Sequence, residues 1–72
     1  LSYKLQRELD SLPERIAGLE AALESRQLKI AAPEFYAQPH AIVQDGLAEL
    51  AQIQADLDAA LHRWMELEDM TG

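Results

Sequence analysis

Two long stretches of the chain carry apolar residues at alternating steps of three and four. In the first stretch these positions are Leu5, Leu9, Leu12, Ile16, Leu19, Leu23 and Ile30, with Arg26 in the one polar place. In the second they are Val43, Leu47, Leu50, Leu57, Leu61 and Trp64, with Gln54 in the one polar place. This heptad spacing is typical of helices that pack along a narrow apolar seam. It predicts two long amphipathic helices.

The stretch between them, "AAPEFYAQPHA", contains Pro33 and Pro39 on either side of Phe35 and Tyr36. Because proline lacks the backbone N–H that a helix interior needs, we expect a connector here. If the chain reverses at the connector, facing residues have numbers with a constant sum, because both helices rise equally per residue. The pairs that meet this condition are Ile30 with Val43, Leu23 with Leu50, Ile16 with Leu57, Leu12 with Leu61 and Leu9 with Trp64. The sequence therefore predicts an all-α fold, an antiparallel helical hairpin or two-helix coiled coil.

The front of the chain is interrupted by Pro13. Ser2 is a plausible N-cap, and residues 3–10 have a helical pattern. Pro13 then marks either a kink or the first turn of a new helix capped by Ser11. We expect a short N-terminal helix before Pro13. Folded over the hairpin, it would cover the extra apolar width that Ile53, Ala60 and Leu67 add to the second helix; a second copy of the chain is the alternative cover.

Composition agrees with a single small helical domain. The 72 residues are 49% hydrophobic, mostly Leu and Ala, with one Phe, one Val and no Cys. These residues favour helix over strand, and the lack of Cys fits a reducing cytoplasmic compartment. No run of about 18 apolar residues or charged leader predicts a membrane span or signal peptide.

The charge is divided unequally. Residues 1–36 hold five Lys/Arg against six Asp/Glu, a net charge of −1, whereas residues 37–72 hold only Arg63 against seven, a net charge of −6. An acidic surface repels phosphates. Nucleic acid binding would therefore be confined to the basic front end.

No pattern for catalysis or metal binding stands out. His62 lies four residues from both Asp58 and Glu66, a spacing that can bind zinc, but no second His or Cys completes a ligand set. A solvated helix face is the simpler interpretation. A two-helix rod offers no pocket that excludes water, so we expect no enzyme active site.

Four side chains are assigned to structure rather than chemistry. Arg26 is expected to reach from the seam toward Asp45 or Glu49, and Trp64 to pack in the core beside Leu9. Phe35 and Tyr36 are expected to fold back and close the hairpin end. Their alternative is an exposed protein contact.

Three segments, "LSYKLQRELDSLPERIAGLEAAL", "PEFYAQPHA" and "HRWMELE", together resemble the C-terminal domain of Uup-type ABC-F ATPases. An "LSYKxQREL" opening, a Leu-Pro step, an "FY" tip and an "RWxxLE" close occur in this order in that family. The resemblance covers essentially the whole chain. It implies that residues 1–72 form a single C-terminal coiled-coil domain, a fragment of a larger cytoplasmic protein whose ATP-binding cassettes, with ATP and Mg²⁺, lie upstream.

The resemblance also implies DNA binding by a module without catalysis of its own. The expected nucleic-acid contacts, weak and salt-dependent, are Tyr3, Lys4, Arg7, Arg15 and Arg63. The alternative is a hairpin that docks on the cassettes or on the ribosome, with Phe35 and Tyr36 as candidate protein contacts. We expect no membrane contact and at most weak self-association.

Overall fold

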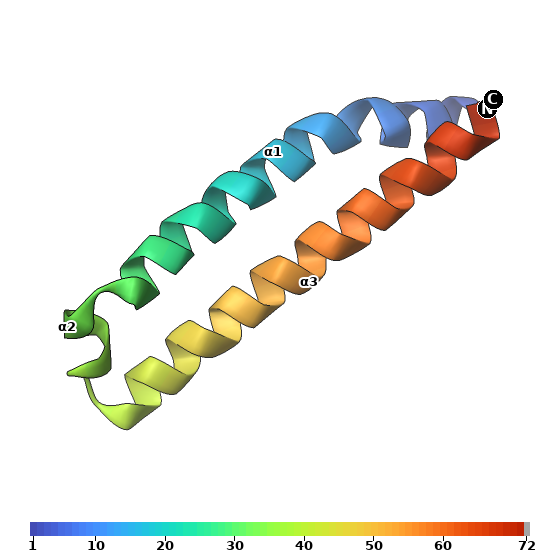
Figure 1. Ribbon diagram of the computed structural model, residues 1–72. Coiled ribbons are helices and arrows are strands. Elements are labelled where there is room, and N and C mark those ends of the chain that lie inside the picture. Colours follow the sequence, from blue (N-terminus) through green and yellow to red (C-terminus); the bar gives the residue numbers. More distant parts are fainter. Residues whose placement is uncertain (72) are drawn as a thin grey trace.

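A computed structural model, which describes residues 1–71, consists of three helices. The long helices α1 (Tyr3–Ala31) and α3 (His40–Thr71) run antiparallel and are joined through the short α2 (Pro33–Tyr36) (Figure 1). The molecule is a rod of 50 × 17 × 15 Å, and both ends of the chain lie at the end opposite α2. The predicted all-α antiparallel hairpin is confirmed.

Helix α1 begins as the sequence predicts. Ser2 is its N-cap, and the Leu5 backbone N–H donates a hydrogen bond to the Ser2 Oγ at 3.3 Å. This bond satisfies one of the backbone donors that the first turn of a helix leaves without a partner. The first residues of α1 are thereby fixed as helix.

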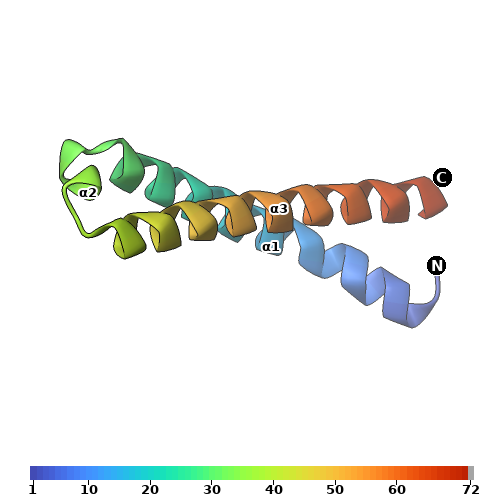
Figure 2. The same cartoon turned by 90° about the horizontal axis from the view of Figure 1, so that it is seen from below.

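The prediction of a separate short helix before Pro13 is wrong. Helix α1 is continuous from Tyr3 to Ala31, with Pro13 inside it. Ser11 is not a cap, since its Oγ donates to the Glu8 carbonyl at 2.8 Å within the helix. The helix survives because Leu9 and Leu12, on either side of the proline's missing bond, are both buried in the core. Figure 1 shows the first third of α1 running at an angle to the rest, and in Figure 2 α1 passes across α3 near its middle.

The connector is a compact turn. Ala32 is the N-cap residue of α2, Pro33 occupies its first turn, and the Pro39 carbonyl accepts from the Ile42 and Val43 N–H groups at 3.0 and 3.1 Å. Proline is well placed at a first helical turn, where no N–H is required. The two prolines therefore define the ends of the turn, as predicted.

The core follows the predicted seam on α1 but only in part on α3, where Leu57 is buried and Val43 and Leu50 are half-buried as predicted. On α1, Leu9 and Leu12 are buried, and Leu5, Ile16 and Leu19 pack against them. On α3 the buried residues are Leu57, Ala60 and Leu67, and Gly46 and Ile53 are half-buried. Leu47 and Leu61, which the pattern placed in the seam, are 36% and 40% exposed.

The predicted and the observed seam of α3 share Val43, Leu50 and Leu57. The observed seam continues from these with the residues three places further on, Gly46, Ile53 and Ala60, instead of four. Gly46 lets the Phe35 ring of the connector rest on α3, and Ala60 lies in the buried cluster with α1. The same face supplies two large apolar side chains, Ile53 and Leu67. The residues expected only to widen the apolar stripe are thus its centre. The front segment covers part of this face, since Leu9 and Leu12 lie in one buried cluster with Ala60 and Leu67.

The placement of Trp64 is also corrected. It was expected in the core beside Leu9 but is 36% exposed, and it lines an open apolar recess with Pro13, Ile16 and Leu61. No described helix is long and apolar enough to cross a bilayer.

Candidate nucleic-acid interface

The predicted nucleic-acid contacts gather at one end of the rod. Tyr3, Lys4, Arg7 and Arg15 are exposed on the first turns of α1, and Arg63 lies beside them on α3. We call these five residues the basic end. The constant-sum register predicted that Arg63 would lie near residues 4–15, and its ion pair with Glu8 confirms this placement.

The outer part of the basic end is formed by Tyr3, Lys4 and Arg7. Tyr3 is 77% exposed, and the Arg7 guanidinium lies over its ring, 5.8 Å from the ring centroid. This cation–π contact holds a flat aromatic surface and a positive charge together on the helix surface. Residues 1–7 contain no Asp or Glu, so this part of the end carries only positive side chains.

Arg63 has a different environment. Its Nε donates to Glu8 Oε2 at 2.5 Å and its Nη2 to Glu8 Oε1 at 2.9 Å, and Glu66 lies 4.0 Å from its Nη1. This bidentate pair joins α1 to α3. Sequence reasoning assigned Arg63 to nucleic acid and missed Glu8. The register that predicted an acidic partner for Arg26 would have found it, had it been applied to the other charged residues beside the seam.

The ion pair shifts the pKa of both Glu8 and Arg63. Hydrogen bonding by Arg63 and its positive charge lower the pKa of the Glu8 carboxyl, and Lys4 adds to this effect. The same hydrogen bond and the charges of Glu8 and Glu66 raise the pKa of Arg63. Each group is therefore held in its charged form, and Glu8 does not add an uncompensated negative charge to the basic end.

The opposite end of the rod contains the two tip aromatics. Phe35 is 5% exposed, whereas Tyr36 is 58% exposed and meets the Phe35 ring edge to face at 5.0 Å between centroids. As predicted, Phe35 closes the hairpin end. Tyr36 instead projects outward and keeps the alternative prediction of an exposed contact.

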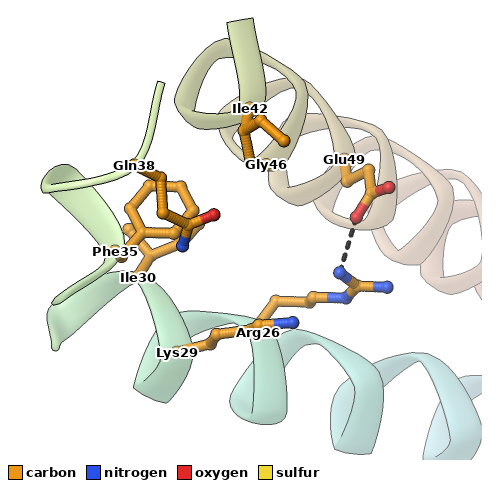
Figure 3. A pocket seen from close by; sticks show the side chains of 8 residues that line it. All are labelled: Arg26, Lys29, Ile30, Phe35, Gln38, Ile42, Gly46 and Glu49. Carbon is orange, nitrogen blue, oxygen red and sulfur yellow. Dashed lines mark ion pairs between the residues drawn. The ribbon is translucent and has the colours of Figure 1, made fainter. Parts of the chain in front are cut away.

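Figure 3 shows the space inside this tip, a cavity of about 200 Å³ between α1 and α3. Phe35 from α2 and Gly46 on α3 line it, and an ion pair of 2.5 Å between Arg26 and Glu49 joins α1 to α3 beside it. Arg26 is therefore already paired with Glu49. Lys29, which lines the same cavity, makes no ion pair among the described residues.

The remaining candidates have no ligand geometry. His62 is exposed and borders a shallow recess with Asp58, Leu61 and Met65. Within residues 1–71, no group of three or more His, Asp or Glu side chains is arranged to hold a metal ion.

The arrangement can now be compared with known proteins. Residues 1–69 match the family model of the ABC transporter C-terminal domain. The chain belongs to this family. The domain is 47% identical over 68 residues to the ATP-binding protein Uup of Escherichia coli (strain K12), covering 94% of this chain and 11% of that protein. It is 45% identical over 69 residues to the Uup-like ATP-binding protein of Haemophilus influenzae, covering 96% of this chain and 15% of that protein.

A solved structure gives the same answer for the fold. It superposes with a TM-score of 0.88 at 46% identity, covering 96% of this chain and 81% of the other. That structure is described as the C-terminal domain of the Uup protein, a DNA-binding coiled coil motif. The resemblance to the Uup-type C-terminal domain is therefore confirmed. The domain spans only 11% to 15% of the length of these two Uup relatives.

Proposed function

We propose that this domain binds DNA through its basic end and carries out no reaction of its own. The observation that carries the proposal is its similarity, over 96% of the chain, to a solved coiled coil described as DNA-binding. ATP binding would then belong to the parts of the longer ATP-binding relatives that this domain does not span.

The geometry of the basic end supports phosphate contacts by Lys4, Arg7 and Arg15. All three side chains are exposed, and none makes an ion pair among the described residues. Glu66, Glu68 and Asp69 lie at the same end of the rod on α3 and repel phosphates, so DNA would approach from the α1 side. Tyr3 offers a ring on which an unpaired base can stack.

Arg63 takes a positioning role in this proposal. Its bidentate pair with Glu8 satisfies two of its N–H groups and neutralises the one carboxylate among residues 1–9. A phosphate would have to compete with this pair. Arg63 therefore supports the basic end by cancelling the charge of Glu8 and by fixing α1 against α3.

So few cations make the affinity weak and sensitive to salt. Three phosphate contacts would give a slope of about −3 in a plot of log affinity against log salt concentration for duplex DNA. Binding should therefore be measured at low ionic strength. Fluorescence anisotropy with labelled duplex and branched DNA is suitable.

The decisive comparison is between two single charge reversals at opposite ends of the rod. Lys4→Glu changes the basic end, and Lys29→Glu makes the same charge change at the tip. We expect Lys4→Glu to lower the affinity at least as much as the loss of one phosphate contact, Lys4→Glu/Arg7→Glu to abolish binding, and Lys29→Glu to have a much smaller effect. Equal losses for Lys4→Glu and Lys29→Glu would contradict the proposed site, and no binding by the unaltered domain would contradict the function.

A second function is favoured by Tyr36 alone. Its ring is 58% exposed at the tip of the hairpin, where it could contact the ATP-binding parts of a longer protein or the ribosome. Tyr36→Ala in a longer protein that contains the domain would then change ATP turnover or ribosome association. A DNA-binding role confined to the basic end would tolerate the same substitution.

A further inference from the structure

An apolar groove lies on one side of the hairpin, between α1 and α3. Pro13 and Ile16 line it from α1, and Leu61 and Trp64 from α3, around a volume of about 270 Å³. A second recess of about 260 Å³ shares Leu61 and adds Met65, which is 58% exposed. We define the groove by these five residues. It leaves the domain's only tryptophan 36% exposed.

The rim of the groove is acidic. Asp58 lines the adjoining recess. Glu20 follows Ile16 by four residues and Glu24 follows Glu20 by four, so both continue the same side of α1. Glu68 likewise follows Trp64 by four on α3. Asp58 therefore borders the groove directly, and the three glutamates lie farther along the same sides of α1 and α3.

Apart from Arg7, the cations lie along the other side of the rod. Lys4, Glu8 and Arg15 follow one another on α1 at steps of four and seven, and Arg26 and Lys29 continue the same line. The ion pairs of Glu8 with Arg63 and of Arg26 with Glu49 fix this line against α3. The two sides of the hairpin therefore differ in charge, and the groove is on the acidic one.

We propose that the groove binds an amphipathic helix of another protein, with bulky apolar side chains on one face and Lys or Arg on both flanks. A third helix laid between α1 and α3 would cover Leu61, Trp64 and Met65 with its apolar residues at i, i+3 or i+4, and i+7. Its basic flanks would face Asp58, Glu20 and Glu68. Trp64 and Leu61 would be the principal anchors, since buried aromatic residues contribute most at such contacts.

Charge complementarity selects this occupant. A second copy that used the same groove would bring acidic rim against acidic rim, which is unfavourable. DNA phosphates would meet the same repulsion. The inference goes beyond DNA binding, and because the groove faces away from the Lys4–Arg15 line, both partners can be bound together.

Trp64 gives a direct readout because no other tryptophan is present. Tryptophan-free synthetic helices with identical Leu and Ile faces, one flanked by Lys and one by Glu, are titrated into the domain while Trp64 emission is recorded. We expect a saturable blue shift with the Lys-flanked peptide and about tenfold or greater weakening with the Glu-flanked peptide. No shift with either peptide, or equal binding of both, would overturn the proposal.

Two leucine variants locate the site. Leu61→Glu should lower the affinity for the Lys-flanked peptide by about tenfold or more. Leu28→Glu, at a position 69% exposed, should leave this affinity unchanged. Circular dichroism checks that each variant is helical. Asp58→Lys reverses one charge of the rim at an exposed position, so it should leave the fold intact. It should weaken binding of the Lys-flanked peptide and strengthen binding of the Glu-flanked one. No change with Asp58→Lys would contradict the charge argument.

Two further outcomes would assign the groove to a different partner. A blue shift that grows with domain concentration alone and is lost in Leu61→Glu would assign the groove to a second copy. The same shift produced by duplex DNA would assign it to nucleic acid. Lys4→Glu should leave peptide binding unchanged, so failure of this proposal and failure of DNA binding are separately visible.

Discussion

Two glycines inside the long helices have opposite roles. A Cβ built on Gly18 would meet no atom within 4 Å, whereas one built on Gly46 would lie 2.7 Å from Cε1 and Cζ of the Phe35 ring. The absence of a side chain at Gly46 therefore lets the buried Phe35 ring lie directly against the backbone of α3. Gly18 carries only the usual cost of glycine in a helix.

We expect Gly18→Ala to raise the free energy of unfolding by about 0.5–1 kcal/mol. Gly46→Ala should instead lower it by roughly 1–3 kcal/mol, since the Phe35 ring must move out of a packed position. Urea unfolding followed by circular dichroism measures both. In a Phe35→Ala background the penalty at Gly46 should disappear. Stabilisation by Gly46→Ala in the unaltered domain would mean that the ring does not rest on this residue.

The Glu8–Arg63 pair makes stability depend on pH. The folded-state pKa of Glu8 lies below its ordinary value of 4.5, so the carboxylate contributes stability above that pH and loses the contribution as pH falls through the folded pKa. We expect the unaltered domain to be more stable than Glu8→Gln near neutral pH. The difference should shrink on acidification below about 4.5. A difference that stays constant with pH would show that ionisation of Glu8 is irrelevant to the pair.

At the scale of the helices, the first helix was the more predictable. Every seam position of α1 but one holds a large aliphatic residue, so only one face could be buried. On α3 two adjacent faces compete, one with Leu47 and Leu61 and the other with Gly46 and Ala60. Leu47 and Leu61 favour the first face. Close approach at Gly46 and the large side chains of Ile53 and Leu67 favour the second. Such a choice depends on tertiary packing and cannot be made from one helix alone.

The continuity of α1 at Pro13 and the partners of the charged residues also depend on tertiary contacts. Pro13 predicts a kink or a new helix when only the local backbone is considered, yet α1 is continuous through it, and Leu9 and Leu12 in the turn just before it are buried in the core. For Arg26 the sequence predicted Asp45 or Glu49 as the partner, and Glu49 is the one that forms the ion pair. The register was not applied to Arg63, which was assigned to DNA from its charge. Position along the rod was thus predictable, whereas the partner of each charged group required the opposite helix.

Leucine truncations on α3 test which face is the seam. Leu67 is fully buried and Leu61 is 40% exposed. We expect Leu67→Ala to lower the free energy of unfolding by about 2–5 kcal/mol and Leu61→Ala by much less, because only the first leaves a cavity. Thermal and urea unfolding provide the comparison. A larger loss at Leu61 would restore the face that the sequence pattern favoured.

At the scale of the whole molecule, the hairpin separates three surfaces. Reversal at α2 brings the start of α1 and the end of α3 together, so the basic end is assembled from both helices. The tip with Tyr36 lies at the far end of a 50 Å rod, and the acidic groove lies on the side away from the cations. Partners at these surfaces would not compete for space.

The central claim is that DNA meets this domain at the end where residues 3–15 and Arg63 lie together. Amide chemical-shift mapping of the isotope-labelled domain during a duplex DNA titration at low salt tests it most directly. The account predicts that perturbed amides cluster in residues 3–15 and around Arg63, with the α2 tip and the Trp64 indole N–H unaffected. Perturbations centred on α2 or on the Trp64 groove would contradict it.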